Sequence, residues 1–199
     1  MKKITQQGFT LIEMITVLGI FMVMTSIVLF NYNRFTNDTI LTNMAYEVAL
    51  SVREAQIYGV SVRKPSGDTS AEFNSPYGIH FIDVADGTPS YFLFADTNDN
   101  GVYDGGPTCT PGGGECVIPY ATQKDIRIVS VLTKAGGGCT EGDLSIVFRR
   151  PNPEPVMNDL IDREYAEIAL KGPRSDSVRY VIVSNNGQIY VRNTSLCNS

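Results

Sequence analysis

One apolar stretch near the N-terminus places the strongest constraint on the fold. From residue 9 to residue 30 the sequence reads FTLIEMITVLGIFMVMTSIVLF, in which Glu13 is the only charged residue. At a rise of about 1.5 Å per residue, a helix of about 22 residues just crosses a hydrocarbon core of roughly 30 Å. Lys2 and Lys3 precede this stretch and no acidic residue does. The positive-inside bias therefore predicts a cytoplasmic N-terminus and an extracytoplasmic remainder, in a protein that crosses the membrane once.

Glu13 distinguishes this stretch from an ordinary secretory signal. Such signals have a shorter apolar region followed by a small-x-small cleavage site, and neither feature is present here. A carboxylate inside an apolar span is costly and is usually retained for a function. Taken alone, Glu13 also fits an interfacial carboxylate that is tolerated near a helix end.

The residues after Phe30 change from apolar to amphipathic. Apolar residues recur at steps of three and four among polar ones, at Leu41, Met44, Val48, Val52, Ala55 and Val62. No proline occurs before Pro65, so the pattern predicts one helix from about Phe9 to Val62, with an apolar stripe that a sheet must cover.

Short β-rich runs separated by turn residues follow Pro65. They are 79–82, 91–95, 126–132, 144–148, 168–170, 178–183 and 189–191. Asn185-Asn186-Gly187 is a strong turn signal and predicts a hairpin between the last two runs. The predicted fold class is α+β, with a long N-terminal helix packed on a mostly antiparallel sheet.

Four cysteines, all beyond the apolar stretch, indicate an oxidising compartment. Cys109 and Cys116 enclose the flexible segment TPGGGE, which favours their pairing and leaves Cys139 to pair with Cys197. The other connectivities stay open, since sequence alone cannot fix them. A zinc site is disfavoured, because there is no Cys-x-x-Cys pair and His80 is the only histidine.

Charge and motif content argue against nucleic-acid binding and against catalysis. The formal net charge is -5, whereas phosphate binding needs clustered Lys and Arg. His80 is the only candidate base of neutral pKa and lies in an alternating strand pattern, where a local hydrogen bond is the simpler interpretation. The glycine runs at Gly112 and Gly136 lack the Gly-Lys-Ser/Thr of a phosphate loop. We expect a non-enzymatic protein that requires no cofactor.

One loop does have metal-ligand spacing. Asp96, Asn98, Asn100 and Asp104, with Gly101 between them, match the first nine positions of a calcium loop. The match ends there, because Pro107 stands where the bidentate acid is expected. Asp, Asn and Gly are also the commonest turn residues, so a candidate calcium site and a plain connection are both open.

The segment KKITQQGFTLIEM resembles the N-terminal signal of type IV pilins and type II secretion pseudopilins. The resemblance implies cleavage between Gly8 and Phe9 by a prepilin peptidase, N-methylation of Phe9, and assembly through Glu13, which pairs with the N-terminal amine of a neighbouring subunit. It further implies a cleaved leader at 1–8, a membrane and fibre-core helix at 9–30, its amphipathic continuation at 31–64 and an extracytoplasmic domain at 65–199.

Three further segments are similar to the GspH/FimT-like branch of minor subunits: SVREAQIYGVSVR, FADTNDNGVYD, and the C-terminal hairpin followed by Cys197. This similarity implies a minor, initiating or tip subunit, with other pilins and an inner-membrane assembly platform as partners. The alternative is a FimT-like subunit that binds DNA during natural transformation. Gln188 occupies the position where DNA binding would require a basic residue, and Arg192 is the only basic residue nearby. Nucleic acid is therefore a disfavoured partner.

Overall fold

The fold is described from a computed structural model of the chain. The structure describes residues 8–61, 75–82, 90–106, 108–111, 114–122, 126–160, 162–172 and 177–197. Two compact units divide the chain, residues 1–37 and 38–199. Each unit is described by itself.

The N-terminal part of the chain forms one helix, α1 (Leu11–Val60). It begins directly after Thr10, a favoured N-cap residue type, and no proline interrupts it. Its last turn is extended by a hydrogen bond from Ser61 N to Ile57 O at 3.0 Å. The helix predicted from about Phe9 to Val62 is therefore present, although Val62 itself lies outside the described residues.

Ten strands form two antiparallel sheets of five strands each. The first sheet has the order β3-β2-β1-β6-β7 and the second the order β10-β9-β8-β4-β5. The first contains β1 (Tyr77–Phe81), β2 (Ser90–Ala95), β3 (Cys116–Ala121), β6 (Leu144–Phe148) and β7 (Pro155–Met157). The second contains β4 (Arg127–Ala135), β5 (Gly138–Glu141), β8 (Arg163–Lys171), β9 (Val178–Ser184) and β10 (Ile189–Arg192).

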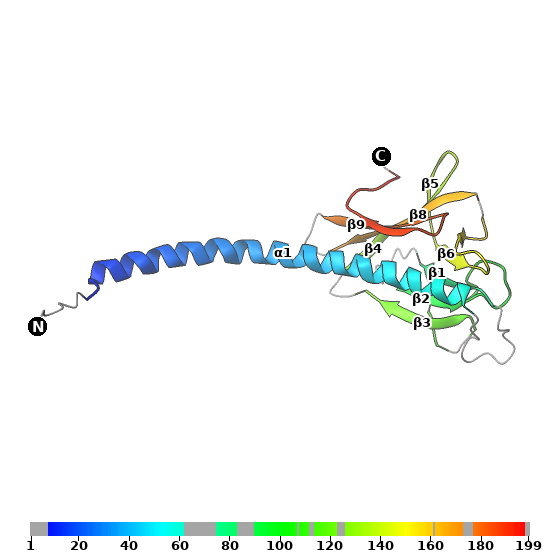
Figure 1. Cartoon of the computed structure of the whole chain (residues 1–199), viewed down its shortest axis with the longest axis horizontal. Helices are drawn as coiled ribbons and strands as arrows, with labels where there is room; N and C mark the ends of the chain where they lie inside the picture. Colours follow the sequence, from blue (N-terminus) through cyan, green and yellow to red (C-terminus); the bar gives the residue numbers. More distant parts are fainter. Residues whose placement is uncertain are drawn as a thin grey trace, which may run out of the picture. The chain divides into compact units, whose positions relative to one another are not determined.

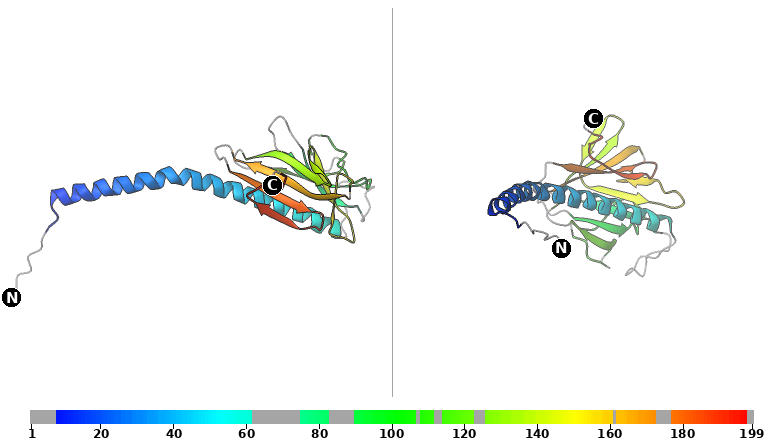
Figure 2. Two further views of the ribbon diagram at one scale, coloured as in Figure 1. Left: turned by 90° about the horizontal axis from the view of Figure 1, so that it is seen from above. Right: turned by 60° about the vertical axis from the view of Figure 1, so that its left-hand side comes forward.

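The main core of the second unit lies between the two sheets and the C-terminal part of α1. Five of the six residues of the predicted helical stripe, Leu41, Met44, Val48, Val52 and Ala55, are buried there. Strands of both sheets contribute to the same core, including β1 and β6 from the first and β8 and β9 from the second. Figures 1 and 2 show β2 and β3 on one side of this part of the helix and β8 and β9 on the other. The predicted α+β class, a helix on antiparallel sheet, is confirmed.

Gly59 allows α1 to approach the first sheet closely. A Cβ at this position would collide with the backbone oxygen and the Cβ of Phe148 in β6. A larger residue would therefore push the last turns of the helix away from the core.

A second, smaller core covers the outer face of the first sheet. Residues of the loop after β2 fold back over this face, and Tyr103 packs edge-on against Phe92 and Phe94 with ring centroids 4.6 and 5.4 Å away. The collision that a Cβ at Gly105 would make with the Tyr103 phenol ring shows how closely the loop follows this tyrosine.

The strand predictions missed three strands and shortened a fourth. β3, β5 and β7 were not predicted, and β8 begins at Arg163 rather than at Ile168. β3 contains Pro119 and β7 begins with Pro155, and proline is a strand breaker that edge strands such as these tolerate. The predicted hairpin is confirmed: β9 and β10 pair antiparallel around Gly187, which has a φ of 80°.

Candidate functional site

The Gly8–Phe9 bond precedes α1 in an exposed segment. Phe9 is 84% exposed, and a Cβ added at Gly8 would meet no atom within 4 Å. Nothing in the described chain therefore requires glycine at this position, so any such requirement would come from an enzyme that binds the segment. The rest of the expected leader, residues 1–7, lies outside the described residues.

Thr10 and Glu13 form a reciprocal cap at the start of α1. Thr10 donates to Glu13 Oε2 from its backbone nitrogen at 2.9 Å and from its hydroxyl at 2.7 Å. Glu13 N donates back to Thr10 Oγ1 at 3.3 Å. This arrangement is a capping box, in which an N-cap hydroxyl and an acid three residues later satisfy each other's backbone donors. Both Thr10 bonds go to one carboxylate oxygen, Oε2, so Oε1 remains available to an outside donor.

The first turns of α1 expose a continuous apolar surface. Residues Leu11–Phe30 meet the length and composition of a membrane span, and none of that span is buried within the chain. Its hydroxyl groups are satisfied internally: Thr25 Oγ1 donates to Phe21 O at 2.8 Å and Ser26 Oγ to Met22 O at 2.9 Å. Glu13 is thus the polar side chain of this surface that can still bind a partner.

The candidate calcium residues lie in the loop after β2, and their oxygens serve the loop itself. Asp96 is fully buried and accepts hydrogen bonds from Asn100 N at 3.0 Å and Gly101 N at 2.8 Å. Asp104 Oδ2 accepts from the side-chain amides of Asn98 at 2.6 Å and Asn100 at 2.7 Å. The four residues are neighbours, but the two Asn side chains present nitrogen, not oxygen, to Asp104. Within the described residues, no three His, Cys, Asp or Glu side chains are grouped to hold a metal. Calcium binding stays a prediction.

Two residues that the sequence did not point to complete this loop. Arg149 Nε lies 2.9 Å from Asp99 Oδ1, and Nη2 of the same residue lies 3.7 Å from Asp96 Oδ2. Glu115 accepts from Thr97 N at 3.0 Å and from Asp104 N at 3.1 Å. Arg149 is fifty positions from Asp99, so no local sequence signal links them.

The buried acids of the loop have perturbed pKa values. Burial raises the pKa of Asp96, and the Gly101 and Asn100 amides and Arg149 oppose this effect. Burial likewise raises the pKa of Glu115 against the amides of Asp104 and Thr97. In both residues the desolvation of the charged form is the largest contribution.

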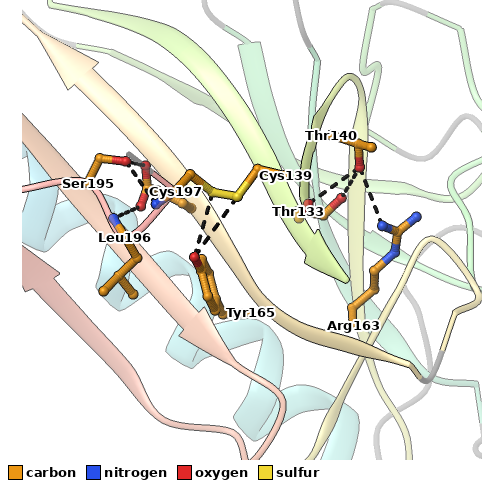
Figure 3. Close-up of a disulfide and its surroundings, with 9 residues drawn as sticks. Thr133, Cys139, Thr140, Arg163, Tyr165, Ser195, Leu196 and Cys197 are labelled. Atoms are coloured by element: carbon orange, nitrogen blue, oxygen red, sulfur yellow. Dashed lines mark hydrogen bonds between the residues drawn. A yellow bond between two sulfur atoms is a disulfide. The ribbon is translucent and has the colours of Figure 1, made fainter. Parts of the chain in front are cut away.

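Two disulfides connect the four cysteines in the pairing that the sequence favoured. Cys109 pairs with Cys116, with Cα atoms 5.4 Å apart, and Cys139 pairs with Cys197 at 5.9 Å. Figure 3 shows the second bond, which joins the C-terminal segment to β5 with Tyr165 beneath it. Next to this bond, the buried Glu167 accepts from Ser195 Oγ and from Leu196 N, both at 2.6 Å. The C-terminal segment is therefore held by a covalent bond and by a carboxylate.

His80 and the C-terminal hairpin carry the remaining candidates. His80 lies in β1 with Nδ1 2.9 Å from Ser145 Oγ, as expected for a strand histidine with a local hydrogen bond. Arg192 ends β10, and Gln188 N donates to Asn186 Oδ1 at 3.1 Å in the turn. No cluster of basic side chains was predicted at this hairpin.

Comparison with known proteins identifies the N-terminal segment. Residues 4–29 match the prokaryotic N-terminal methylation motif. No curated protein and no solved structure matches the chain. The match contains Gly8, Phe9 and Glu13 and covers most of the apolar surface of α1. Together with the helix and the antiparallel sheets, this motif supports the type IV pilin and pseudopilin family, whose subunits are processed by prepilin peptidase.

Proposed function

We propose that the chain is a minor subunit of a type II secretion pseudopilus or type IV pilus, where it initiates the fibre or occupies its tip. The observation that carries the proposal is Glu13: a carboxylate at the start of a helix whose apolar side chains over Leu11–Phe30 are left exposed by the rest of the chain. Such a surface needs a membrane or neighbouring helices to cover it.

Assembly follows from the charges at this end of the helix. Cleavage after Gly8 creates a positive amine at Phe9, and each subunit then carries one amine and one carboxylate in apolar surroundings. A buried charge is costly when unpaired and tolerable when paired and hydrogen-bonded. Pairing of Glu13 with the amine of a neighbouring subunit therefore favours subunits that enter in the correct register.

The minor role is supported by similarity to the GspH/FimT-like branch at three places in the second unit. SVREAQIYGVSVR ends α1, FADTNDNGVYD spans the end of β2 and the loop after it, and the β9–β10 hairpin precedes Cys197. The two disulfides fit an oxidising compartment outside the cytoplasm. The proposed orientation places the N-terminus in the cytoplasm and the second unit outside, with the inner-membrane assembly platform as a partner.

Subunit counting tests the minor role. Sheared fibres from the native host are digested, and this chain and the major subunit are quantified with isotope-labelled peptides. We expect well under one copy per ten major subunits, together with loss of fibres when the gene is deleted. A stoichiometry close to that of the major subunit would refute the minor role and leave the family assignment intact.

DNA uptake is the alternative that this proposal must exclude. Arg149 is a basic residue of the second unit, but acidic side chains already surround it. Its guanidinium nitrogens lie 3.7, 2.9 and 3.8 Å from carboxylate oxygens of Asp96, Asp99 and Asp159. The purified full chain in detergent is titrated with labelled duplex DNA at low salt, and we expect no binding at micromolar protein. Salt-sensitive binding that is lost in Arg192→Ala would favour the DNA-binding subunit instead.

A further inference from the structure

A recess of about 420 Å³ lies beside Tyr103, where the loop after β2 meets the ends of β1 and β6. His80, Tyr103 and Ser145 are among its lining residues, and each is at least nine-tenths buried. The recess is separate from the N-terminal motif and from the candidate calcium residues, none of which lines it.

The wall of this recess is held rigid. Asn158 Oδ1 accepts from Ser145 N at 2.7 Å, and Asn158 Nδ2 donates to Asp143 O at 2.9 Å. Tyr103 N donates to Ser145 Oγ at 3.1 Å. The backbone around Asp143 and the position of Tyr103 are therefore fixed without a ligand, which lowers the entropic cost of binding one.

His80 contributes a neutral ring to the recess. Burial lowers the pKa of His80 to about 4, and the nearby Asp143 carboxylate opposes this shift. The imidazole is therefore uncharged at neutral pH, with one ring nitrogen that can accept a hydrogen bond. Ser145 Oγ can accept from both Tyr103 N and His80 Nδ1, in which case Nε2 is the acceptor.

The charges and rings of the lining select for a positive guest. Among the described residues that line it, Asp143 is the one acidic side chain, and none is Lys or Arg. The Tyr103 ring lies 5.2 Å from the His80 ring, and an aromatic face attracts a cation. A carboxylate, a neutral imidazole and a phenol ring together attract an organic cation and repel an anion.

We propose that this recess binds an alkylammonium or guanidinium group, with Asp143 as its counter-ion and His80 as a hydrogen-bond acceptor. Two sources share this chemistry: a Lys or Arg side chain of a partner protein, and a free amine. The proposal does not depend on which fibre the chain belongs to.

His80 provides a site-specific probe, because it is the only histidine in the chain. Histidine-selective ¹³C and ¹⁵N labelling of the full chain in detergent gives one set of imidazole resonances. We expect saturable shifts of these resonances on titration with n-butylammonium, with a dissociation constant of about 1 mM for so small a ligand. n-Butanol and butyrate should give no saturable shift. Equal responses to all three probes, or none to n-butylammonium, would overturn the proposal.

Two variants test separately the charge of Asp143 and the free volume of the recess. Asp143→Asn removes the charge of an exposed residue and should weaken n-butylammonium binding at least tenfold, whereas Glu141→Gln, an exposed acid two residues away that does not line the recess, should have no effect. Gly106→Leu keeps every charge and adds an apolar side chain at a residue that lines the recess, where an added Cβ meets no atom within 4 Å. It should also weaken binding. Unchanged affinity in Asp143→Asn would refute the role of Asp143.

The tautomer and the source are tested in the same sample. The ¹⁵N shifts should place the His80 proton on Nδ1, and a proton on Nε2 would refute its role as acceptor. A blocked tripeptide with a central lysine is then compared with n-butylammonium. Tighter binding of the peptide indicates a partner side chain, and binding of n-butylammonium alone indicates a free amine; failure of both would overturn the proposal.

Discussion

Thr10 and Glu13 satisfy each other's polar groups before any neighbour is present. Two Thr10 donors lie 2.9 and 2.7 Å from Glu13 Oε2, and Glu13 N lies 3.3 Å from Thr10 Oγ1. The capping box lowers the cost of a carboxylate in apolar surroundings and fixes the start of α1. It uses no atom of residues 1–8, so it can persist after cleavage and leave Oε1 for a neighbouring amine.

The first prediction concerns processing. In cells with an active prepilin peptidase, the chain should lose residues 1–8 and carry N-methyl-Phe9, as intact-mass measurement of the membrane fraction would show. Gly8→Ala should be cleaved slowly and Gly8→Leu not at all. Both substitutions leave the described chain unstrained, because nothing lies near Gly8. Retention of Met1 in the wild type would contradict the prediction.

The second prediction concerns Glu13. Glu13→Val should insert into the membrane at least as well as the wild type, because a charge leaves the apolar span. Its incorporation into sheared fibres, measured by quantitative immunoblotting, should fall by about tenfold or more, in line with loss of a buried ion pair. Thr25→Val is the matched control, since the Thr25 hydroxyl bonds only carbonyls of its own helix. Wild-type incorporation of Glu13→Val would disprove the pairing.

The third prediction compares the two disulfides. In the chain-entropy account, closing a longer loop stabilises more. Cys139 and Cys197 are separated by 58 residues, and Cys109 and Cys116 by 7. Serine replacement of Cys139 and Cys197 should cost about 4 kcal/mol of unfolding free energy. Serine replacement of Cys109 and Cys116 should cost about 2 kcal/mol. Urea titrations of a fragment of residues 38–199, followed by circular dichroism, would measure both; a larger cost for the short loop would contradict the account.

The fourth prediction concerns the pH dependence that His80 confers. Its folded pKa of about 4 lies below the usual value near 6.5, so the unfolded chain binds this proton more readily. Stability from this group is complete above pH 6.5 and is lost as the pH falls toward 4, by roughly 3 kcal/mol in all. The difference in unfolding free energy between the wild type and His80→Gln should shrink by this amount over that range. A constant difference would refute the assignment.

The sequence predicted the elements whose determinants are local and missed those that depend on distant residues. The Cys109–Cys116 bond was favoured because a short glycine-rich segment separates the two residues. The Asn186-Gly187 turn was predicted because Asn-Gly is a local turn signal, and the φ of 80° at Gly187 is one that suits glycine. Arg149 was missed, since its partner Asp99 is fifty positions away. The second sheet was also missed, because seven short β runs do not indicate how strands are divided between sheets.

Arg149 changes what the calcium prediction means. Without a cation, the carboxylates of Asp96, Asp99 and Asp104 should repel one another. The Arg149 guanidinium lies 3.7 Å from Asp96 and 2.9 Å from Asp99, so part of this charge is already balanced. Calcium would also have to turn the Asn98 and Asn100 oxygens toward Asp104, whose Oδ2 now accepts both of their amide nitrogens. Both effects lower the expected affinity.

The fifth prediction is therefore a modest effect of calcium, with a dissociation constant of about 10⁻⁴ to 10⁻³ M, typical of extracellular modules. At tenfold that concentration, linkage stabilises the folded state by about 1.4 kcal/mol, which should raise the melting temperature of the 38–199 fragment by roughly 3–6 °C. Asp104→Asn should abolish the increase and leave the Arg149 contacts intact, because Asp104 forms none of them. Arg149→Gln should enlarge the increase, since calcium then supplies the only positive charge in the loop. Magnesium at the same concentration controls for ionic strength. Identical melting curves in calcium and in chelator, for the wild type and for Arg149→Gln alike, would mean that the loop is a polar turn whose only cation is Arg149.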